Sequence, residues 1–399
     1  MEESRKNLWR KGILEIANLV LAELTGVIIY FFSRICYLPE WIAWLPGLVV
    51  FIVVVVSRVK RKVAFAILPV LLVVFLCSDG LFRGDKLEVK GIFLRGVTSL
   101  MMDNRIPVVR HFGAALFPAP EYNEDGTRVS SYKAPEEYTY RQFMQDGVPY
   151  EFVEKAGTSN VILYLHGGAY LQRISSAYDV VMTAFTEVAD VNVLVPDYRI
   201  PPEHPYPTDL EDVYKAYLWL LEQGYKSENV VIAGDSAGGG LALALGLYLK
   251  EQGQPMPAGF LTFSAWTDLS KREEDYTENK SVETMFKHNT TISQGIDNYL
   301  ANGASADDPF VSPAYGDFTG FPQMLLQVGN YEILKQNTQA VYDKANSVGV
   351  EVGMEAYPGM FHDFQTLKGT LKVADDAWES VGRFLAECFS ETESVAEPR

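Results

Sequence analysis

The sequence predicts an α/β fold with a mostly parallel central sheet and helices on both faces. From about residue 137 onward, short apolar runs rich in Val, Ile and Leu alternate with longer segments of helical periodicity. The runs are continuously apolar, which indicates strands buried on both faces, and the helical segments supply the crossovers that a parallel sheet requires. Because the chemistry of such sheets lies at the carboxyl ends of their strands, functional residues are expected directly after the apolar runs.

The strand candidates begin with a hairpin. Residues 137–143 and 149–155 flank the dipeptide Asp146-Gly147, which favours a tight two-residue turn. The later strand candidates are VILYLHGG (161–168), VNVLVPDYR (191–199), NVVIAGDS (229–236), AGFLTFSAWTD (258–268), QMLLQVGN (323–330) and VEVGMEAYPG (350–359), and the helices between them include 209–224 and 238–253.

Three apolar segments near the N-terminus, 13–33, 41–56 and 63–78, are predicted to be transmembrane helices. Glu15 and Glu23 weaken the first, because a lipid-facing carboxylate is costly unless it is paired or lines a bundle. The alternatives are a signal peptide or a soluble helical extension. A single signal peptide does not explain three apolar segments with a basic loop between the last two.

Basic residues predict the orientation of these segments. Four Lys or Arg residues precede the first segment, and four more lie in the 57–62 loop between the second and the third. Under the positive-inside rule both stretches are cytoplasmic. The protein is then a multi-pass membrane protein, and three spans place the C-terminal α/β domain on the extracytoplasmic side. The loss of one span would return it to the cytoplasm.

The chain is expected to divide into four parts. Residues 1–79 form the membrane region, residues 80–135 a linker and N-terminal cap, residues 136–390 the catalytic domain and residues 391–399 a tail. Within the catalytic domain, residues 270–306 interrupt the alternation with a polar, largely helical insertion. It is expected to fold over the catalytic edge of the sheet as a cap, and surface decoration is the alternative.

Charge and cysteine content exclude several classes of function. The net charge is −17, although residues 1–90 carry 12 Lys and Arg against 8 Asp and Glu. A protein with this negative net charge repels the phosphate backbones of nucleic acids, which argues against nucleic-acid binding. Cys36, Cys77 and Cys388 form no CxxC or Cys/His cluster, so no zinc site or disulfide framework is expected.

The pentapeptide Gly234-Asp235-Ser236-Ala237-Gly238 predicts the nucleophile. It fits G-x-S-x-G, directly after one strand candidate and directly before the glycine-rich helix candidate. A tight strand-to-helix turn pushes the serine Oγ clear of the sheet, and glycines on both sides remove Cβ clashes at that turn. The following helix directs its N-terminal N–H groups at developing negative charge. A small-residue turn that merely packs a helix on a sheet is the structural alternative.

An LHGGA segment after the strand candidate at 161–168 predicts an oxyanion hole. Glycines after a strand expose backbone N–H groups, as in the HGGG-type loops of lipases and esterases. The expected donors are the N–H groups of Gly167, Gly168 and Ala237. Ala169 stands where such loops have a third glycine, and its N–H is retained. His166 is expected to be a structural hydrogen-bonding residue at the base of the loop.

The general base and its acid follow from chain order, which is serine, then carboxylate, then histidine. Of the histidines after the serine, His288 lies in the polar insertion, whereas His362 follows the last strand candidate and is predicted to be the base. Glu332 follows the strand candidate at 323–330 and is predicted to hold the histidine tautomer. Asp343 lies further along a helix, and Asp363 is expected to point away from the base.

These segments resemble the hormone-sensitive-lipase-like branch of the α/β-hydrolases, which includes bacterial carboxylesterases and arylacetamide deacetylases. The resemblance spans roughly residues 137–388 and rests on YLHGGAY, VPDYRIPPEHPYP, GDSAGG, FSAWTDLS, DPFVSPAYGDFTGFP, VGNYEIL and YPGMFHDF. It implies an α/β-hydrolase fold with a helical cap built partly from the N-terminal part of the chain. The chain departs from the family at Gln336, where relatives carry a second carboxylate.

The expected function is hydrolysis of small to medium acyl esters by an acyl-enzyme on Ser236, by a protein with N-terminal transmembrane helices in the bilayer. Neither a metal nor a cofactor is required. Short acyl chains are favoured only by the resemblance. One alternative keeps the triad but cleaves an amide, lactone or carbamate. Another is a ligand-binding receptor of the same fold, against which the intact set of Ser236, Glu332 and His362 argues. The sequence does not indicate an oligomeric state.

Overall fold

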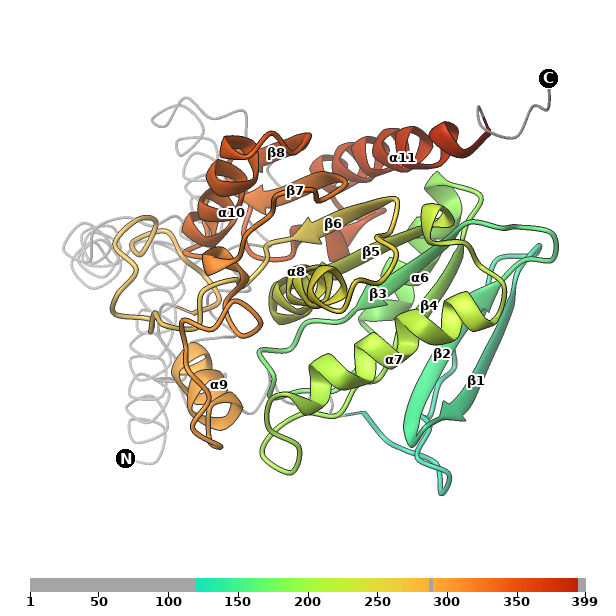
Figure 1. Cartoon of the computed structure of the whole chain (residues 1–399), viewed down its shortest axis with the longest axis horizontal. Helices are drawn as coiled ribbons and strands as arrows, with labels where there is room; N and C mark the ends of the chain where they lie inside the picture. The colour runs from blue at the N-terminus through green and yellow to red at the C-terminus, as the bar shows by residue number, and fades with distance from the viewer. Residues whose placement is uncertain (1–119, 287–289, 394–399) are drawn as a thin grey trace, which may run out of the picture. The chain divides into compact units, whose positions relative to one another are not determined.

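The computed structural model describes residues 120–286 and 290–393 (Figure 1). Within them, eight strands form one sheet in the order β1-β2-β4-β3-β5-β6-β7-β8. β2 runs antiparallel to β1 and β4, and the pairs from β4 to β8 are parallel, which confirms the predicted sheet. The strands are β1 (Thr139–Gln145), β2 (Val148–Glu154), β3 (Val161–Leu165), β4 (Asn192–Pro196), β5 (Val230–Asp235), β6 (Gly259–Phe263), β7 (Gln323–Gly329) and β8 (Val352–Tyr357).

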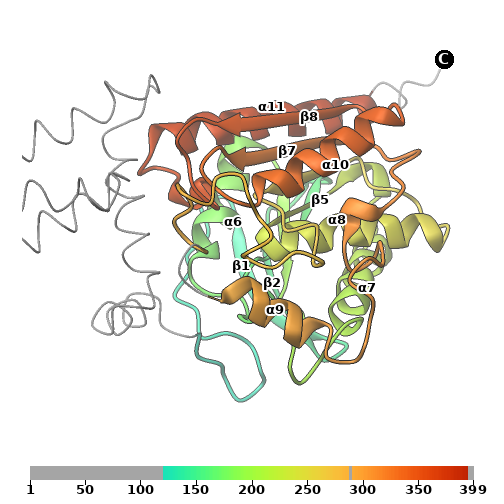
Figure 2. The same cartoon turned by 90° about the vertical axis from the view of Figure 1, so that its left-hand side faces the viewer.

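Helices cover both faces of this sheet (Figures 1 and 2). They are α6 (Tyr178–Val188), α7 (Thr208–Glu222), α8 (Ser236–Glu251), α9 (Thr291–Tyr299), α10 (Lys335–Ser347) and α11 (Lys372–Glu393). One apolar core packs α7, α8 and α10 on the sheet, and a second packs α6 and α11 on the other face. Ile162 and Leu163, neighbours on β3, belong to different cores because successive strand residues face opposite ways.

The first two strands form the expected hairpin. Asp146 and Gly147 connect them with φ values of +50° and +81°, as a two-residue type I′ turn requires. Arg141 on β1 pairs with Glu154 on β2 at 2.7 Å across the register that this turn sets. The hairpin therefore extends the sheet beyond its parallel part.

The insertion at 270–306 is less helical than predicted. In the parts of it that the structure describes, α9 is the only helix, and the stretch before residue 287 consists of turns and bends. Short side-chain contacts to nearby backbone groups shape this stretch; the Glu283 carboxylate, for example, accepts the Met285 N–H at 2.6 Å. Such local hydrogen bonds offer the backbone an alternative to a helix.

The predicted transmembrane segments at 13–33, 41–56 and 63–78 lie outside the described residues. So does His288. No helix within residues 120–286 and 290–393 combines the length and the apolar character that crossing a membrane requires.

Candidate active site

Ser236 occupies a sharp turn between β5 and α8. β5 ends at Asp235, α8 begins at Ser236, and the serine has a φ of +51°, a strained value for a residue other than glycine. The turn requires glycine on both sides: a Cβ at Gly234 would lie 2.4 Å from the Gly238 oxygen, and one at Gly238 would lie 2.1 Å from the Leu165 oxygen. The G-x-S-x-G sequence therefore folds as the predicted strand-to-helix turn.

The structure brings His362 and Glu332 to this serine. His362 Nε2 lies 2.9 Å from the Ser236 Oγ, and His362 Nδ1 lies 2.7 Å from Glu332 Oε2. The three residues follow β5, β7 and β8, whose carboxyl ends meet at one edge of the sheet. Figure 1 shows the arrowheads of β6 and β7 pointing to the side of the molecule on which α9 lies.

Two further donors fix the Glu332 carboxylate. Its Oε1 accepts hydrogen bonds from the Ser264 hydroxyl at 2.7 Å and from the Gly329 N–H at 2.6 Å, which leaves Oε2 for the histidine. Glu332 is fully buried. Ser264 was not among the predicted site residues, although it directly follows the β6 run, where functional residues are expected in such a sheet.

The structure does not support Gly167 as an oxyanion donor. Its N–H donates to the Asp235 Oδ1 at 2.9 Å, so it is directed into the protein rather than at a substrate oxygen. A Cβ at this position would lie 2.3 Å from the other Asp235 oxygen, which explains why glycine is needed there. Gly168 and Ala169 follow with positive φ values of +125° and +55°. Ala237 lies in the first turn of α8, whose N–H groups lack intrahelical acceptors.

His166 has structural surroundings, as expected. Its Nδ1 lies 2.8 Å from the Gly167 oxygen, and its ring stacks on Tyr198 at 4.3 Å between centroids. Tyr198 also donates its hydroxyl proton to the His166 carbonyl oxygen. The fully buried imidazole therefore anchors the loop at 166–170, which was predicted to form the oxyanion hole, to the segment that follows β4.

The expectation that Asp363 points away from the base is wrong. Its Oδ2 lies 3.1 Å from His362 Nε2, the nitrogen that also faces the serine. Asp363 has a φ of +54°, in the left-handed region, and in this backbone conformation its carboxylate lies beside the histidine ring. The amino-acid type alone does not reveal such a turn.

Burial and the neighbouring carboxylates shift the pKa of His362 in opposite directions. Burial favours the neutral imidazole, but the negative charge and hydrogen bond of Asp363, followed by those of Glu332, raise the pKa of His362 well above its ordinary value. Burial also raises the pKa of Asp235 to about 7, with a further contribution from the charge of Asp363. Besides Glu332, the site therefore contains two further carboxyl groups, those of Asp235 and Asp363.

Residues from the described part of the insertion contact residues of the site. The Phe286 ring contacts the His362 ring edge to face at 4.9 Å, and Tyr299 of α9 stacks on Tyr170 of the loop at 166–170 at 4.1 Å. The backbones also approach closely, since a Cβ at Gly295 would lie 2.6 Å from the Ala169 oxygen. Figure 2 shows α9 lying across this edge of the sheet.

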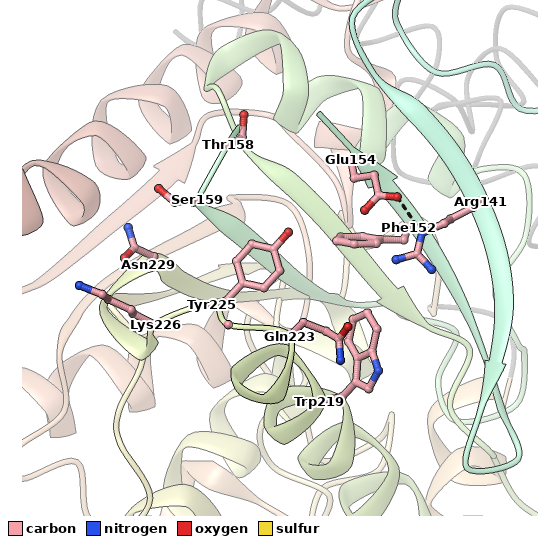
Figure 3. A pocket seen from close by; sticks show the side chains of 11 residues that line it. Arg141, Phe152, Glu154, Thr158, Ser159, Trp219, Gln223, Tyr225, Lys226 and Asn229 are labelled. Atoms are coloured by element: carbon pink, nitrogen blue, oxygen red, sulfur yellow. Dashed lines mark hydrogen bonds and ion pairs between the residues drawn. The ribbon is translucent and has the colours of Figure 1, made fainter. Parts of the chain in front are cut away.

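A cavity of about 550 Å³ lies at the opposite edge of the sheet (Figure 3). Ser159, just before β3, and Asn229, just before β5, contribute to its lining, so it opens at the amino ends of these strands. Arg141 lies at the cavity and stacks over the Phe143 ring at 4.4 Å. Neither Ser236 nor His362 nor Glu332 lines this cavity.

Comparison with known proteins agrees with this geometry. Residues 162–366 match the family described as the alpha/beta hydrolase fold. An esterase of Acinetobacter venetianus is 33% identical over 234 residues, which are 59% of this chain and 77% of that protein. An acetyl-hydrolase of Streptomyces hygroscopicus is 38% identical over 224 residues, which are 56% of this chain and 74% of that protein.

Solved structures of esterases are also similar. One is an esterase from the bacterial hormone-sensitive lipase family, with 27% identity and a TM-score of 0.65 over 76% of this chain and 100% of that one. Another is an esterase/lipase from an uncultured bacterium, with 28% identity, a TM-score of 0.65 and the same coverage. The likeness thus extends from the sequence motifs to the arrangement of the sheet and helices.

Proposed function

This chain belongs to the alpha/beta hydrolase family, and we propose that it cleaves small to medium acyl esters through an acyl-enzyme on Ser236. It is a carboxylic ester hydrolase that resembles the hormone-sensitive-lipase-like esterases. One observation supports the proposed mechanism. An unbroken series of contacts runs from the Ser236 Oγ through both ring nitrogens of His362 to the Glu332 carboxylate, at 2.9 Å and 2.7 Å.

In the proposed reaction, His362 acts first as base and then as acid. Its Nε2 accepts the Ser236 hydroxyl proton as the Oγ attacks the ester carbonyl carbon, while Glu332 holds the proton on Nδ1 and stabilises the imidazolium. The imidazolium then gives its Nε2 proton to the departing alcohol oxygen, which leaves the acyl group on the serine. A water molecule, deprotonated by the same nitrogen, then attacks the acyl carbon; the bond to the Ser236 Oγ breaks, and the Nε2 proton returns to that oxygen as the carboxylic acid leaves.

The tetrahedral intermediates require donors for their negative oxygen. We assign this role to the N–H groups of Gly168 and Ala237, and we replace Gly167 by Ala169, the next N–H along the loop. Successive backbone N–H groups in a turn can form an anion-binding concavity, and Gly168 and Ala169 lie in such a turn, with positive φ at both residues. The Gly167 N–H instead supports the loop through its bond to Asp235.

The same residues could cleave an amide, a lactone or a carbamate. We favour esters because relatives of this chain carry the names esterase and acetyl-hydrolase. A non-catalytic receptor is a weaker alternative, because such a role has no need for the contacts that Ser236 makes through His362 to Glu332.

We also propose the arrangement of the whole chain. Residues 1–79 would anchor the protein in the membrane, residues 80–135 and the 270–306 insertion would form a cap, and 136–390 would be the catalytic domain with 391–399 as its tail. The contacts of Phe286 with His362 and of Tyr299 with Tyr170 support the cap assignment of the insertion.

Replacement of the nucleophile tests the central proposal. Ser236→Ala should abolish hydrolysis of p-nitrophenyl acetate and labelling by a fluorophosphonate, because both require the Oγ. Ser347→Ala, at an exposed hydroxyl on α10, is the matched control and should leave both unchanged. Retained turnover in Ser236→Ala would refute the assignment. Parallel assays with acyl esters, anilides and lactones would identify the bond that the enzyme prefers.

A further inference from the structure

His362 Nε2 has two oxygen neighbours where the proposed mechanism uses one. The Ser236 Oγ lies at 2.9 Å and the Asp363 Oδ2 at 3.1 Å. In the neutral imidazole that accepts the serine proton, Nε2 carries a lone pair and cannot donate a hydrogen bond. An ionised carboxylate at this distance then opposes the lone pair. In the imidazolium, by contrast, the positive charge at Nε2 is attracted to the Asp363 carboxylate, which lies within ion-pair distance. The carboxylate therefore favours the protonated base.

The position of Asp363 is fixed by its backbone. Its N–H donates to the Ser264 hydroxyl oxygen at 3.2 Å, and its carbonyl oxygen accepts the Thr366 hydroxyl at 2.7 Å. These bonds lie on both sides of the residue and hold the left-handed conformation with φ of +54°. Aspartate and asparagine adopt this conformation more readily than most residues do. The contact with Nε2 is therefore built into the loop.

Asp363 shares its surroundings with a second buried carboxyl group, Asp235. The Asp235 side chain is 2% exposed and accepts hydrogen bonds from the hydroxyls of Tyr164 on β3, at 2.7 Å, and Tyr178 on α6, at 3.0 Å. The charge of Asp363 contributes to the raised pKa of Asp235, so the two carboxyl groups interact electrostatically. The Asp363 Oδ1 is buried and has no hydrogen-bond partner among the described residues.

On this basis we infer that Asp363 is a second carboxylate partner of His362, a positioning residue that competes with Ser236 for Nε2 and holds the base in its protonated, inactive form until the pH rises. The inference rests on the proposed function, because it concerns the proton that His362 must lose before Ser236 can attack.

The electrostatics of the neighbouring groups support this role. Two carboxyl groups in one buried site cannot both ionise easily, so the pair titrates as a unit. Burial raises the pKa of Asp363, and the positive charge of protonated His362 offsets part of this rise. Three groups interact with Asp363 from the sheet and α6: the Asp235 carboxyl group and the phenols of Tyr164 and Tyr178. Glu332 interacts with it from the loop after β7. Glu283 of the insertion interacts with His362.

The sign of the effect on rate follows directly. The base is active only when neutral, and Asp363 favours its charged form, so the rate falls as the pH drops through the raised pKa of His362. The acid limb of kcat/KM should therefore lie above the ordinary histidine pKa of about 6.5. Removal of the Asp363 charge should move that limb down by about 1 unit or more, the usual effect of one close opposite charge.

Asp363→Asn tests the inference on the full-length protein, since asparagine preserves the left-handed backbone and removes the charge. Two measurements as a function of pH apply: kcat/KM for p-nitrophenyl acetate, and the rate of labelling by a fluorophosphonate, which reports serine attack alone. The acid limbs of both pH profiles, that of kcat/KM and that of the labelling rate, should shift to lower pH by the same amount. Asp343→Asn on α10, at an exposed carboxylate, is the matched control and should leave both limbs in place.

Asp363→Gly guards against an effect of asparagine itself, because glycine also fits the left-handed backbone and lacks the carboxyl group. It should shift both limbs in the same direction. An acid limb that stays in place, or moves to higher pH, in either folded variant would overturn the inference. Failure of the proposed function would appear differently, as turnover and labelling that persist in Ser236→Ala on the same preparation.

Discussion

The Glu332 carboxylate accepts hydrogen bonds from three donors. These bonds determine the expected effect of replacing it. Glu332→Gln keeps the shape but not the charge, and its amide nitrogen would face a donor that the carboxylate now satisfies, either His362 Nδ1–H or the Gly329 N–H. The variant should lose about a hundredfold or more in kcat, as when the acid of a serine triad is neutralised.

The measurement is steady-state hydrolysis of p-nitrophenyl acetate, with the concentration of folded enzyme checked independently. Glu351→Gln is a suitable control, because Glu351 is exposed just before β8. An unaffected rate in Glu332→Gln would show that the imidazolium draws its stabilisation from another carboxylate.

At the residue scale, the sequence predicted which side chains meet but not how each of them is oriented. Chain order and position after a strand placed Ser236, Glu332 and His362, because these features depend on the topology of the sheet. The direction of the Asp363 side chain depends on one dihedral angle, φ of +54°, and aspartate is compatible with either sign. The Gly167 N–H likewise turns toward Asp235, a partner that only the folded turn reveals.

At the scale of elements, Glu283 connects the insertion to the loop that carries Glu332. One oxygen accepts the Met285 and Phe286 N–H groups at 2.6 and 3.3 Å, and the other accepts the Ile333 N–H at 2.7 Å. Glu283→Gln leaves one oxygen for donors on two segments, so a buried N–H loses its acceptor. We expect a loss of about 1–3 kcal/mol in the free energy of unfolding.

Because Phe286 contacts the His362 ring, esterase activity should fall together with stability in this variant. Thermal unfolding and kcat/KM measure the two effects. Glu278→Gln, at an exposed carboxylate of the same insertion, should change neither. If Glu283→Gln were as stable and as active as the unchanged protein, the insertion would not depend on this connection.

Strands and helices were predictable where burial is continuous. The helix expected at 209–224 is α7 at Thr208–Glu222, and the one expected at 238–253 is α8 at Ser236–Glu251, because buried faces at helical spacing specify them. The insertion was predicted less well. Side chains such as Glu283 satisfy its backbone, and polar composition does not distinguish that arrangement from a helix.

At the scale of the whole molecule, the proposed anchor and the catalytic domain make a joint prediction. With three spans at 13–33, 41–56 and 63–78 and a cytoplasmic basic loop at 57–62, residues 136–390 lie outside the cytoplasm. Protease added to intact cells should then remove the fluorophosphonate-labelled domain, and the activity should sediment with membranes until detergent is added. Protection from protease in intact cells, with cleavage after permeabilisation, would instead indicate an even number of spans. Activity that stays in the supernatant would refute the anchor.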